Sequence, residues 1–390
     1  MKKCIVISDS FKGTVSSLEI CEIAKQSIPR FFPECEVIAL PVADGGEGTV
    51  ECFVKGINAE PVTVSATGPL GAPLDAVYAR HGNQAIVEMA SVAGLPLLNN
   101  RLDPMNATTF GVGQLIRHAI ENGCTEILLG LGGSCTNDGG CGCAAALGVK
   151  FYDEDNNSFI PTGGTLSKIC KIDCKDAKEL LKGVQITVMC DVENPLYGPT
   201  GAAYVFGPQK GADEKMVREI DSGLRRMSEV VETELGKAVA QIPGAGAAGG
   251  MGAGCIAFLN AKLKSGIDAV LDMVEFDRRI EGADLVITGE GRIDSQSVHG
   301  KVISGIVKRT RVKNIPLMAI VGSIHPSAAE AYDLGVTAMF GIDREAVAFE
   351  KYDREAVAFE KYADRSAENY RQTLEDILRL LKAMKERWQK

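Results

Sequence analysis

The sequence predicts an α/β protein in which both ends of the chain form a Rossmann-like parallel-sheet domain and the middle forms an inserted mixed α/β domain. Both ends alternate short apolar segments with amphipathic ones, as in KCIVIS followed by SSLEICEIAKQSI. Such alternation is typical of a parallel sheet covered by helices. The segment ATGPLGAPLDAVYARHGNQAIVEMAS instead indicates antiparallel strands with turns at Gly68-Pro69 and at residues 81–83. We therefore expect residues 1–66 and 284–390 to form the Rossmann-like domain and residues 67–283 the inserted one.

Length and composition exclude several classes of protein. A chain of 390 residues suggests two or three domains, and 45% apolar with 24% charged residues is ordinary for a globular protein. The net charge of −9 argues against nonspecific nucleic-acid binding. No window approaches the roughly 18 apolar residues of a membrane helix, and the apolar run in MKKCIVISDSFKG is too short for a signal peptide. We expect a cytoplasmic protein without nucleic-acid or membrane partners, and its oligomeric state stays open.

Several helices can be placed from local signals. Ser16 or Ser17 can cap a helix that has Glu19 in its first turn. Residues 214–235 indicate a long helix, and another begins near Cys255. The last helix should dock on the sheet through one apolar stripe, which consists of Leu374, Ile377, Leu378, Leu381 and Met384.

The twelve cysteines do not have the spacing of a metal site. No CxxC pair occurs, and the chain has only four histidines. Most cysteines lie in apolar runs, which favours core positions over metal ligation or disulfides. We interpret His299 and His325 as structural or polar loop residues, because no Ser/His/Asp or Cys/His arrangement accompanies them.

The ten residues DREAVAFEKY occur twice in succession, at 343–352 and at 353–362. Two identical copies indicate a duplication and not a solenoid, which needs at least about three repeats. We expect one copy to be surplus helix or a bulged loop.

Two polar loops follow the first two predicted strands, where open parallel sheets bind ligands. Asp9, Ser10 and Lys12 precede a helix start, a combination that suits an anion. Asp44 and Glu47 lie close together between glycines, so their carboxylates repel each other. Mg²⁺ with bound phosphates is one way to neutralise this negative charge. The alternative for each loop is an ordinary solvent-exposed turn that binds no ligand.

The glycine-rich segment GLGGSCTNDGGCG, residues 130–142, lies between a buried strand and a helix. Its backbone N–H groups can approach a phosphate closely, and Ser134 and Thr136 add hydroxyls. Asp138 could serve a metal or a sugar hydroxyl. The segment lacks the lysine of a Walker A loop, and a structural turn is the alternative.

Two further strands end in charged loops. Asp191 is a candidate metal ligand or general base, or else the start of an Asx-turn before Pro195. The next cluster can clamp a carboxylate and neutralise phosphate, or form surface salt bridges; it contains Glu290, Arg292, Asp294 and Lys301. Glycines, acids, lysines and hydroxyls at strand ends suit phosphoryl transfer.

Seven stretches, in order along nearly the whole chain, closely resemble the bacterial class I glycerate kinases. They are SDSFKG, PVADGGEGT, ATGPLG, GLGGSCTNDGG, CDVENPLYGPTGAA, GAGAAGGMGAG and LVITGEGRIDSQSVHGK. The resemblance implies ATP-dependent phosphorylation of D-glycerate, normally to 2-phosphoglycerate, with Mg²⁺. It also implies two α/β domains with the active site in the cleft between them.

A mechanistic hypothesis follows from the residues and the resemblance together. It assigns Asp191, Asp294 and Lys12 to catalysis; Asp9, Ser10, Arg292 and Glu290 to substrate; Gly132, Gly133, Ser134, Thr136 and Lys301 to the ATP phosphates; and Asp44 and Glu47 to Mg²⁺. Which aspartate is the base, and which loop binds ATP or glycerate, stays open. The alternatives are a kinase that yields 3-phosphoglycerate, a kinase of another small hydroxy acid, and a non-catalytic metabolite sensor.

Overall fold

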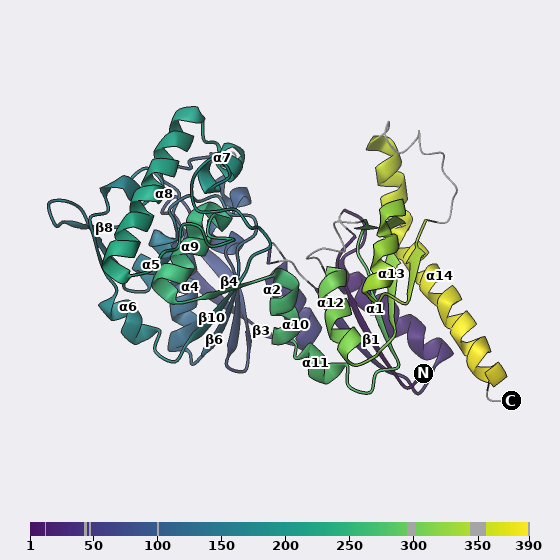
Figure 1. Cartoon of the computed structure of the whole chain (residues 1–390). Helices are drawn as coiled ribbons and strands as arrows, with labels where there is room; N and C mark the ends of the chain where they lie inside the picture. Colours follow the sequence, from purple (N-terminus) through teal and green to yellow (C-terminus); the bar gives the residue numbers. More distant parts are fainter. Residues whose placement is uncertain are drawn as a thin grey trace. The chain divides into compact units, whose positions relative to one another are not determined.

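The computed structural model describes most of the chain (Figure 1). The described residues are 1–388 without 12, 43–44, 47, 100, 295–301 and 344–355, and for 356–364 and 388 only the backbone is described. Most of the DREAVAFEKY duplication therefore lies outside the described side chains. The chain divides into two compact units: unit 1 contains residues 1–43, 55–57 and 270–390, and unit 2 contains residues 44–54 and 58–269. The division falls within α2 (Thr49–Ile57) and α10 (Gly266–Met273).

Unit 1 is built on a five-stranded, wholly parallel sheet in the order β16-β14-β12-β1-β2. Its strands are β1 (Lys3–Ser8), β2 (Glu36–Pro41), β12 (Leu285–Thr288), β14 (Leu317–Val321) and β16 (Ala338–Gly341). In the register of the sheet, Cys4 lies between Val37 and Leu285. This pairing confirms a parallel sheet formed by both ends of the chain.

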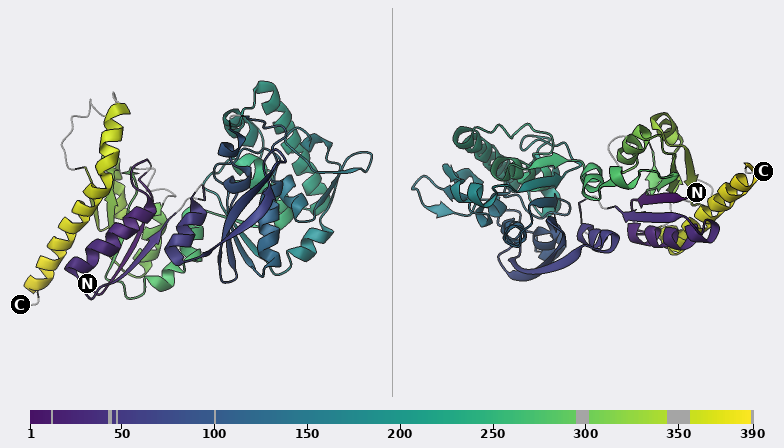
Figure 2. Two further views of the ribbon diagram at one scale, coloured as in Figure 1. Left: turned by 180° about the vertical axis from the view of Figure 1, so that it is seen from behind. Right: turned by 90° about the horizontal axis from the view of Figure 1, so that it is seen from below.

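Helices cover both faces of the unit 1 sheet (Figure 2). They are α1 (Ser17–Phe31), α11 (Phe276–Arg279), α12 (Val302–Val312), α13 (Glu330–Leu334) and α14 (Ala356–Trp388). Cys4 and Val6 belong to the core formed with α1 and α14. Because side chains alternate along a strand, the equally buried Ile5 and Ile7 point to the opposite face.

Two helix predictions for unit 1 can be compared with the structure. Ser16 caps α1, since its Oγ accepts a hydrogen bond of 3.1 Å from the Glu19 N–H. On α14, Leu374 and Leu378 are buried, as predicted, in a core that contains α1 as well as the sheet. Met384 is 37% exposed, because the packed stripe of this helix ends at Leu381.

Unit 2 contains a six-stranded mixed sheet in the order β11-β10-β6-β5-β4-β3. Its strands are β3 (Glu60–Thr67), β4 (Pro73–His81), β5 (Gln84–Glu88), β6 (Glu126–Gly130), β10 (Gln185–Met189) and β11 (Lys262–Lys264). The pairs β3–β4 and β4–β5 are antiparallel, as predicted for this segment, and the others are parallel. β3 lies almost wholly before residue 67 and yet belongs to this sheet, because it pairs with β4 along its full length. The domain boundaries at 66/67 and 283/284 stay a prediction.

One large core fills the space between the unit 2 sheet and its helices. The helices are α3 (Ala90–Ala93), α4 (Phe110–Glu121), α5 (Cys141–Ala146), α6 (Lys175–Leu180), α7 (Ala202–Phe206), α8 (Glu214–Leu235) and α9 (Ala247–Leu259). A small second sheet contains β7 (Lys150–Tyr152), β8 (Ser158–Phe159) and β9 (Lys171–Asp173). The bounds of α8 confirm the predicted helix at 214–235, which Asp213 caps and Gly236 ends in a left-handed conformation.

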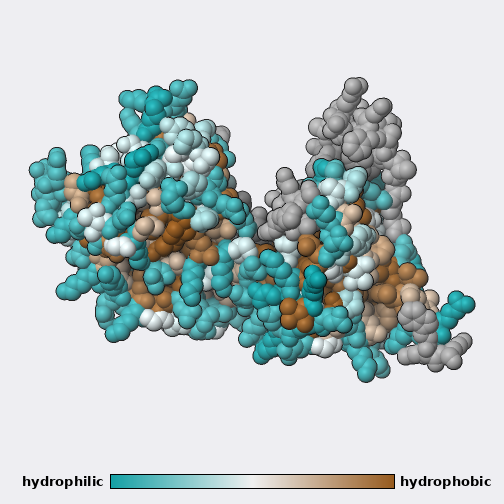
Figure 3. Space-filling view, in the orientation of Figure 1, coloured by the Kyte–Doolittle hydropathy of each residue, from teal (hydrophilic) through white to brown (hydrophobic). Residues whose placement is uncertain are grey.

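The surface of both units carries many hydrophilic side chains, with smaller hydrophobic patches between them (Figure 3). All twelve cysteines are free thiols and nine of them are buried, which fits their interpretation as small core residues. Among the described residues, no helix has the length and apolarity needed to cross a membrane.

Candidate active site

In unit 1 the candidate site lies where the chain order of the sheet reverses. From β1 the chain continues to β2 on one side, and β12 pairs with β1 on the other. The Asp9 N–H donates a hydrogen bond of 2.9 Å to the Gly289 carbonyl, which joins the loops after β1 and β12. A Cβ at Gly289 would lie 2.0 Å from the Ile320 carbonyl oxygen, so only glycine fits there. Ligands of open α/β sheets bind at such a switch point.

Five predicted residues are carried by these loops of unit 1. Asp9 Oδ1 accepts a hydrogen bond of 2.7 Å from the Ser10 N–H. Glu290 is 6% exposed at the end of β12. The Arg292 Nε lies 3.9 Å from Asp294 Oδ2, with an arginine side chain that is 61% exposed. The structure therefore gathers them at the carboxyl edge of one sheet, where the ion pair expected as one alternative is formed between Arg292 and Asp294.

Four predicted residues lie outside the described part of the chain. They are Lys12, Asp44, Glu47 and Lys301. Among the described residues, no group of three or more His, Cys, Asp or Glu side chains is arranged to hold a metal ion. The proposed Mg²⁺ ligands are in the undescribed part, so their role stays a prediction.

In unit 2 the two predicted glycine loops lie against each other. The Gly132 N–H donates a hydrogen bond of 3.0 Å to the Gly45 carbonyl. A Cβ at Gly130 would lie 2.3 Å from that same oxygen, and one at Gly132 would lie 2.6 Å from the Gly46 Cα. Backbone therefore packs directly on backbone, and any side chain at these positions would separate the loops.

Asp191 belongs to the same edge of the unit 2 sheet. It follows β10, whose last residue Met189 pairs with Gly130 at the end of β6. The exposed Asp191 carboxylate accepts a hydrogen bond of 2.7 Å from the N–H of Gly266, the first residue of α10. This bond joins two loops that are distant in sequence, which differs from the Asx-turn expected as the alternative.

Asp138 organises the glycine-rich segment from the inside. The side chain is fully buried, and its oxygens accept hydrogen bonds from the N–H groups of Thr109 at 2.7 Å, Gly140 at 3.0 Å and Gly142 at 3.2 Å. The Thr109 hydroxyl donates a further bond of 2.8 Å. Burial raises the pKa of the Asp138 carboxyl, and these hydrogen bonds oppose that shift. Its carboxylate thus ties the start of α5 to the start of α4, in place of the expected metal or sugar contact.

The hydroxyl-bearing residues of this segment are also buried. Ser134 is 7% exposed and Thr136 is 0% exposed. An isolated bridge pairs Ser134 with Gly94, which follows α3. Their part in binding ATP phosphates stays a prediction.

Two polar residues of unit 2 were missed as site candidates. Lys210 is 1% exposed, and its Nζ donates a hydrogen bond of 2.7 Å to the Thr136 carbonyl. Asn137 is 0% exposed. Asn137 lay in the segment already singled out, whereas nothing local in GPQKGA marks Lys210 as buried.

A buried lysine predicts a stability that depends on pH. Burial lowers the pKa of Lys210 from 10.5 to about 8. Between these values the unfolded chain keeps the proton that the native protein has released. The contribution of Lys210 to the free energy of unfolding therefore rises with pH across this window, by roughly 3 kcal/mol.

Denaturant unfolding of the wild type and Lys210→Met at pH 7, 8.5 and 10 measures this effect. The free energy of unfolding of the wild type is expected to gain on that of the variant as the pH rises. Parallel pH profiles for the two proteins would contradict the prediction.

Glu88 is a further buried acid at this edge of the sheet. It ends β5, is 7% exposed, and accepts a hydrogen bond from the Val50 N–H in the first turn of α2. A carboxylate at a helix N-terminus is favourable because the unpaired N–H groups there carry partial positive charge. Glu88 thus fixes the helix that follows Gly45, Gly46 and Gly48.

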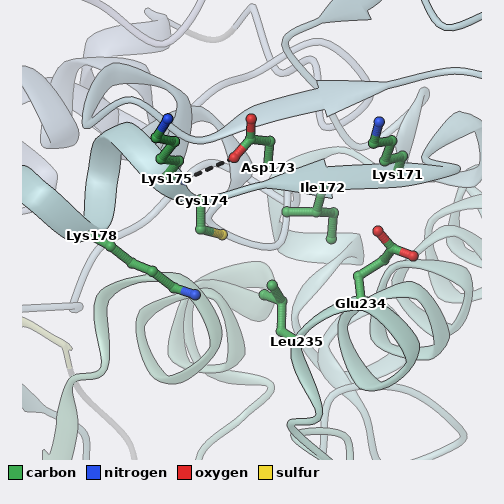
Figure 4. A pocket seen from close by; sticks show the side chains of 8 residues that line it. All are labelled: Lys171, Ile172, Asp173, Cys174, Lys175, Lys178, Glu234 and Leu235. Atoms are coloured by element: carbon green, nitrogen blue, oxygen red, sulfur yellow. Dashed lines mark hydrogen bonds between the residues drawn. The ribbon is translucent and has the colours of Figure 1, made fainter.

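A separate open groove of about 450 Å³ lies on unit 2 (Figure 4). It is lined by Lys171, Ile172, Asp173, Cys174, Lys175, Lys178, Glu234 and Leu235. Its three lysines are exposed, and the Lys175 N–H donates to Asp173 Oδ1 at 2.9 Å. None of the predicted site residues lines this groove, and its charges are those of a solvated surface.

Comparison with known proteins decides the family. The sequence model described as the Glycerate kinase family matches residues 4–382. The chain belongs to the glycerate kinase family. The predicted resemblance is thereby confirmed, and this member of the glycerate kinase family is an enzyme, a kinase with ATP as its co-substrate.

Individual relatives of this glycerate kinase family member cover most of its length. A glycerate kinase of Bacillus cereus is 42% identical over 90% of this chain and 92% of the relative. A glycerate 2-kinase of Escherichia coli is 41% identical over 87% of this chain and 90% of the relative. A crystal structure of a protein provisionally assigned as glycerate kinase 2 from Salmonella typhimurium LT2 has a TM-score of 0.86 and 37% identity, and the match covers 98% of this chain and 99% of that one. This structural match confirms the predicted α/β fold class.

Proposed function

We propose that this enzyme transfers the γ-phosphoryl group of ATP to the 2-hydroxyl of D-glycerate, with Mg²⁺, and releases 2-phosphoglycerate and ADP. The observation that carries the proposal is the packing of two glycine loops, with Asp191, at one edge of the unit 2 sheet. Backbone N–H groups at the edge of a sheet suit phosphate oxygens. The name of the Escherichia coli relative, glycerate 2-kinase, supports the choice of the hydroxyl.

The residues divide into roles that the chemistry requires. In unit 1, Arg292 meets the carboxylate of glycerate, and Asp9, Ser10 and Glu290 orient the substrate through polar contacts. In unit 2, Gly132, Gly133, Ser134 and Thr136 hold the ATP phosphates. Lys301, which lies outside the described residues, is assigned to the phosphates as well. Lys12 neutralises charge that develops on the phosphoryl group.

The reaction exchanges one P–O bond for another. A glycerate hydroxyl oxygen bonds to the γ-phosphorus while the bond from that phosphorus to the bridging oxygen of ADP breaks. Asp191 or Asp294 accepts the proton of the attacking hydroxyl. Asp44 and Glu47 would hold Mg²⁺, which would neutralise charge on the phosphates when bound.

A coupled ADP-release assay tests the proposal. ADP release from MgATP is expected to require D-glycerate, to be weaker with L-glycerate, and to stop when a chelator removes the metal. ³¹P NMR of the product distinguishes 2-phosphoglycerate from 3-phosphoglycerate. If D-glycerate leaves ADP release at the rate without acceptor, the substrate is another hydroxy acid or the protein acts as a metabolite sensor.

A further inference from the structure

Two neighbouring residues of unit 2 have buried polar atoms that the protein leaves unsatisfied. Thr136 and Asn137 are both 0% exposed. Within the described part of the chain, Thr136 Oγ1 and both Asn137 amide atoms, Nδ2 and Oδ1, make no hydrogen bond. Burying such groups unpaired costs about 1–3 kcal/mol each. A native protein therefore normally pairs them with water, an ion or a ligand.

Lys210 brings a buried charge to the same place. Its Nζ lies 2.7 Å from the carbonyl oxygen of the peptide that joins Thr136 to Asn137. No carboxylate of the described residues lies within ion-pair distance of this ammonium, and two of its three N–H bonds have no acceptor there. Burial lowers the pKa of Lys210 and the buried Asp138 carboxylate opposes that shift, but among the described residues this carboxylate forms no ion pair with the ammonium. A buried charge without a directly bonded opposite partner is strongly unfavourable.

The backbone on the other side of this peptide is unusually constrained. Ala248, Gly249 and Gly250 have successive φ angles of 53°, 69° and 90°. A Cβ at Gly249 would lie 2.0 Å from the Thr136 carbonyl oxygen. The Gly249 carbonyl also accepts a hydrogen bond of 3.1 Å from the Gly139 N–H. Left-handed backbone at Ala248 costs about 1–3 kcal/mol, and such strain is concentrated at functional sites.

We propose that Lys210, Asn137 and Thr136 form a buried site for one oxyanion group, either a carboxylate or a phosphate. The unsatisfied atoms offer up to five hydrogens, two on Lys210, two on Asn137 and one on Thr136, and one positive charge. An oxyanion accepts several of these hydrogens and neutralises the charge. A water molecule would leave the charge unpaired, and a cation would add to it.

The inference rests on the proposed function for its two sources of an oxyanion, the carboxylate of D-glycerate and a phosphate of ATP. Both groups are planar or tetrahedral arrays of acceptor oxygens, so the same donors serve either one. Titration calorimetry of the full chain with D-glycerate, ATP and inorganic phosphate, each separately, distinguishes them without turnover.

The test compares the wild type with Lys210→Gln and with a control, Lys178→Gln, which changes an exposed lysine of the open groove. Lys210→Gln is expected to raise the Kd of D-glycerate or of ATP about tenfold or more, because a hydrogen bond to a charged group contributes about 1.5–3 kcal/mol. A loss confined to D-glycerate assigns the site to the carboxylate, and a loss confined to ATP assigns it to a phosphate. Lys178→Gln is expected to leave every Kd within twofold of the wild type.

A second variant keeps the test decisive if Lys210→Gln does not fold. Thr136→Val retains the shape of the side chain and removes a hydroxyl that has no protein partner, so it is expected to fold and to weaken the same ligand several-fold. Kd values within twofold of the wild type for all three ligands in the folded variants would overturn the oxyanion site. Failure of the proposed function is seen separately, as wild-type protein that releases no ADP with D-glycerate.

Discussion

Replacing Asp191 or Asp294 by asparagine is expected to lower kcat by about 10²–10⁴-fold in the variant that lacks the general base. Asparagine keeps the size of the side chain but cannot accept the proton of the attacking hydroxyl. Both aspartates are carried by loops at the carboxyl edges of their sheets, where Asp191 also bonds the Gly266 N–H and Asp294 lies 3.9 Å from Arg292. The variant at the aspartate that is not the general base should change KM more than kcat, because that aspartate contributes to substrate binding or to loop geometry.

Single-turnover and steady-state kinetics on each variant give the two parameters. Glu193→Gln is the matched control, since Glu193 is an exposed acid two residues from Asp191 to which no role is assigned. Circular dichroism checks that each variant is folded. Near-normal kcat in both Asp191→Asn and Asp294→Asn would show that neither is the base.

Replacing Asp138 by asparagine is expected to lower the free energy of unfolding by roughly 3 kcal/mol. The two carboxylate oxygens of Asp138 accept hydrogen bonds from three backbone N–H groups and from two hydroxyls, those of Thr109 at 2.8 Å and Thr108 at 3.5 Å. An amide has only one oxygen, so its NH₂ group must face at least one buried N–H donor. The lost bond and the donor left unpaired both destabilise the native state.

Urea unfolding at pH 7 measures this loss, with Asp153→Asn as the control. Asp153 also accepts backbone hydrogen bonds, from Asp155 at 3.1 Å and Asn157 at 2.8 Å, but it lies in an exposed turn. Water can replace those bonds, so the control is expected to lose less than about 1 kcal/mol. Equal losses in the two variants would show that burial of the hydrogen bonds around Asp138 does not increase their contribution to the free energy of unfolding.

Local signals in the sequence predicted those helices and turns whose ends are determined by residues within or next to the same segment. The helix at 214–235 is an example, because Asp213 caps it and Gly236 supplies the left-handed residue that ends it. The turns that separate β3, β4 and β5 were likewise visible as glycine-containing breaks. The pairing partner of β3 was not, since strand pairing depends on contacts outside the local segment.

The loops of the candidate site were predicted from the sequence, but the burial of the side chains beneath them was not. Polar and glycine-rich residues after strands are readable because parallel strands bring their carboxyl ends to one edge, as Asp9 and Gly289 illustrate. The burial of an individual polar side chain cannot be predicted from such a local pattern. Asp138 therefore appeared to be a ligand-facing acid, whereas Lys210 was overlooked as an ordinary charged residue of a short loop.

The position of β1 between β2 and β12 has a consequence for synthesis on the ribosome. The hydrogen bond from the Lys3 N–H to Asp284 spans 281 residues, so β1 and β12 cannot pair until three quarters of the chain has been made. At about 5–20 residues per second this delay is roughly 15–55 s. During that time the edge of β1 that later pairs with β12 has no partner strand, and an unpaired strand edge of a nascent chain is prone to aggregation.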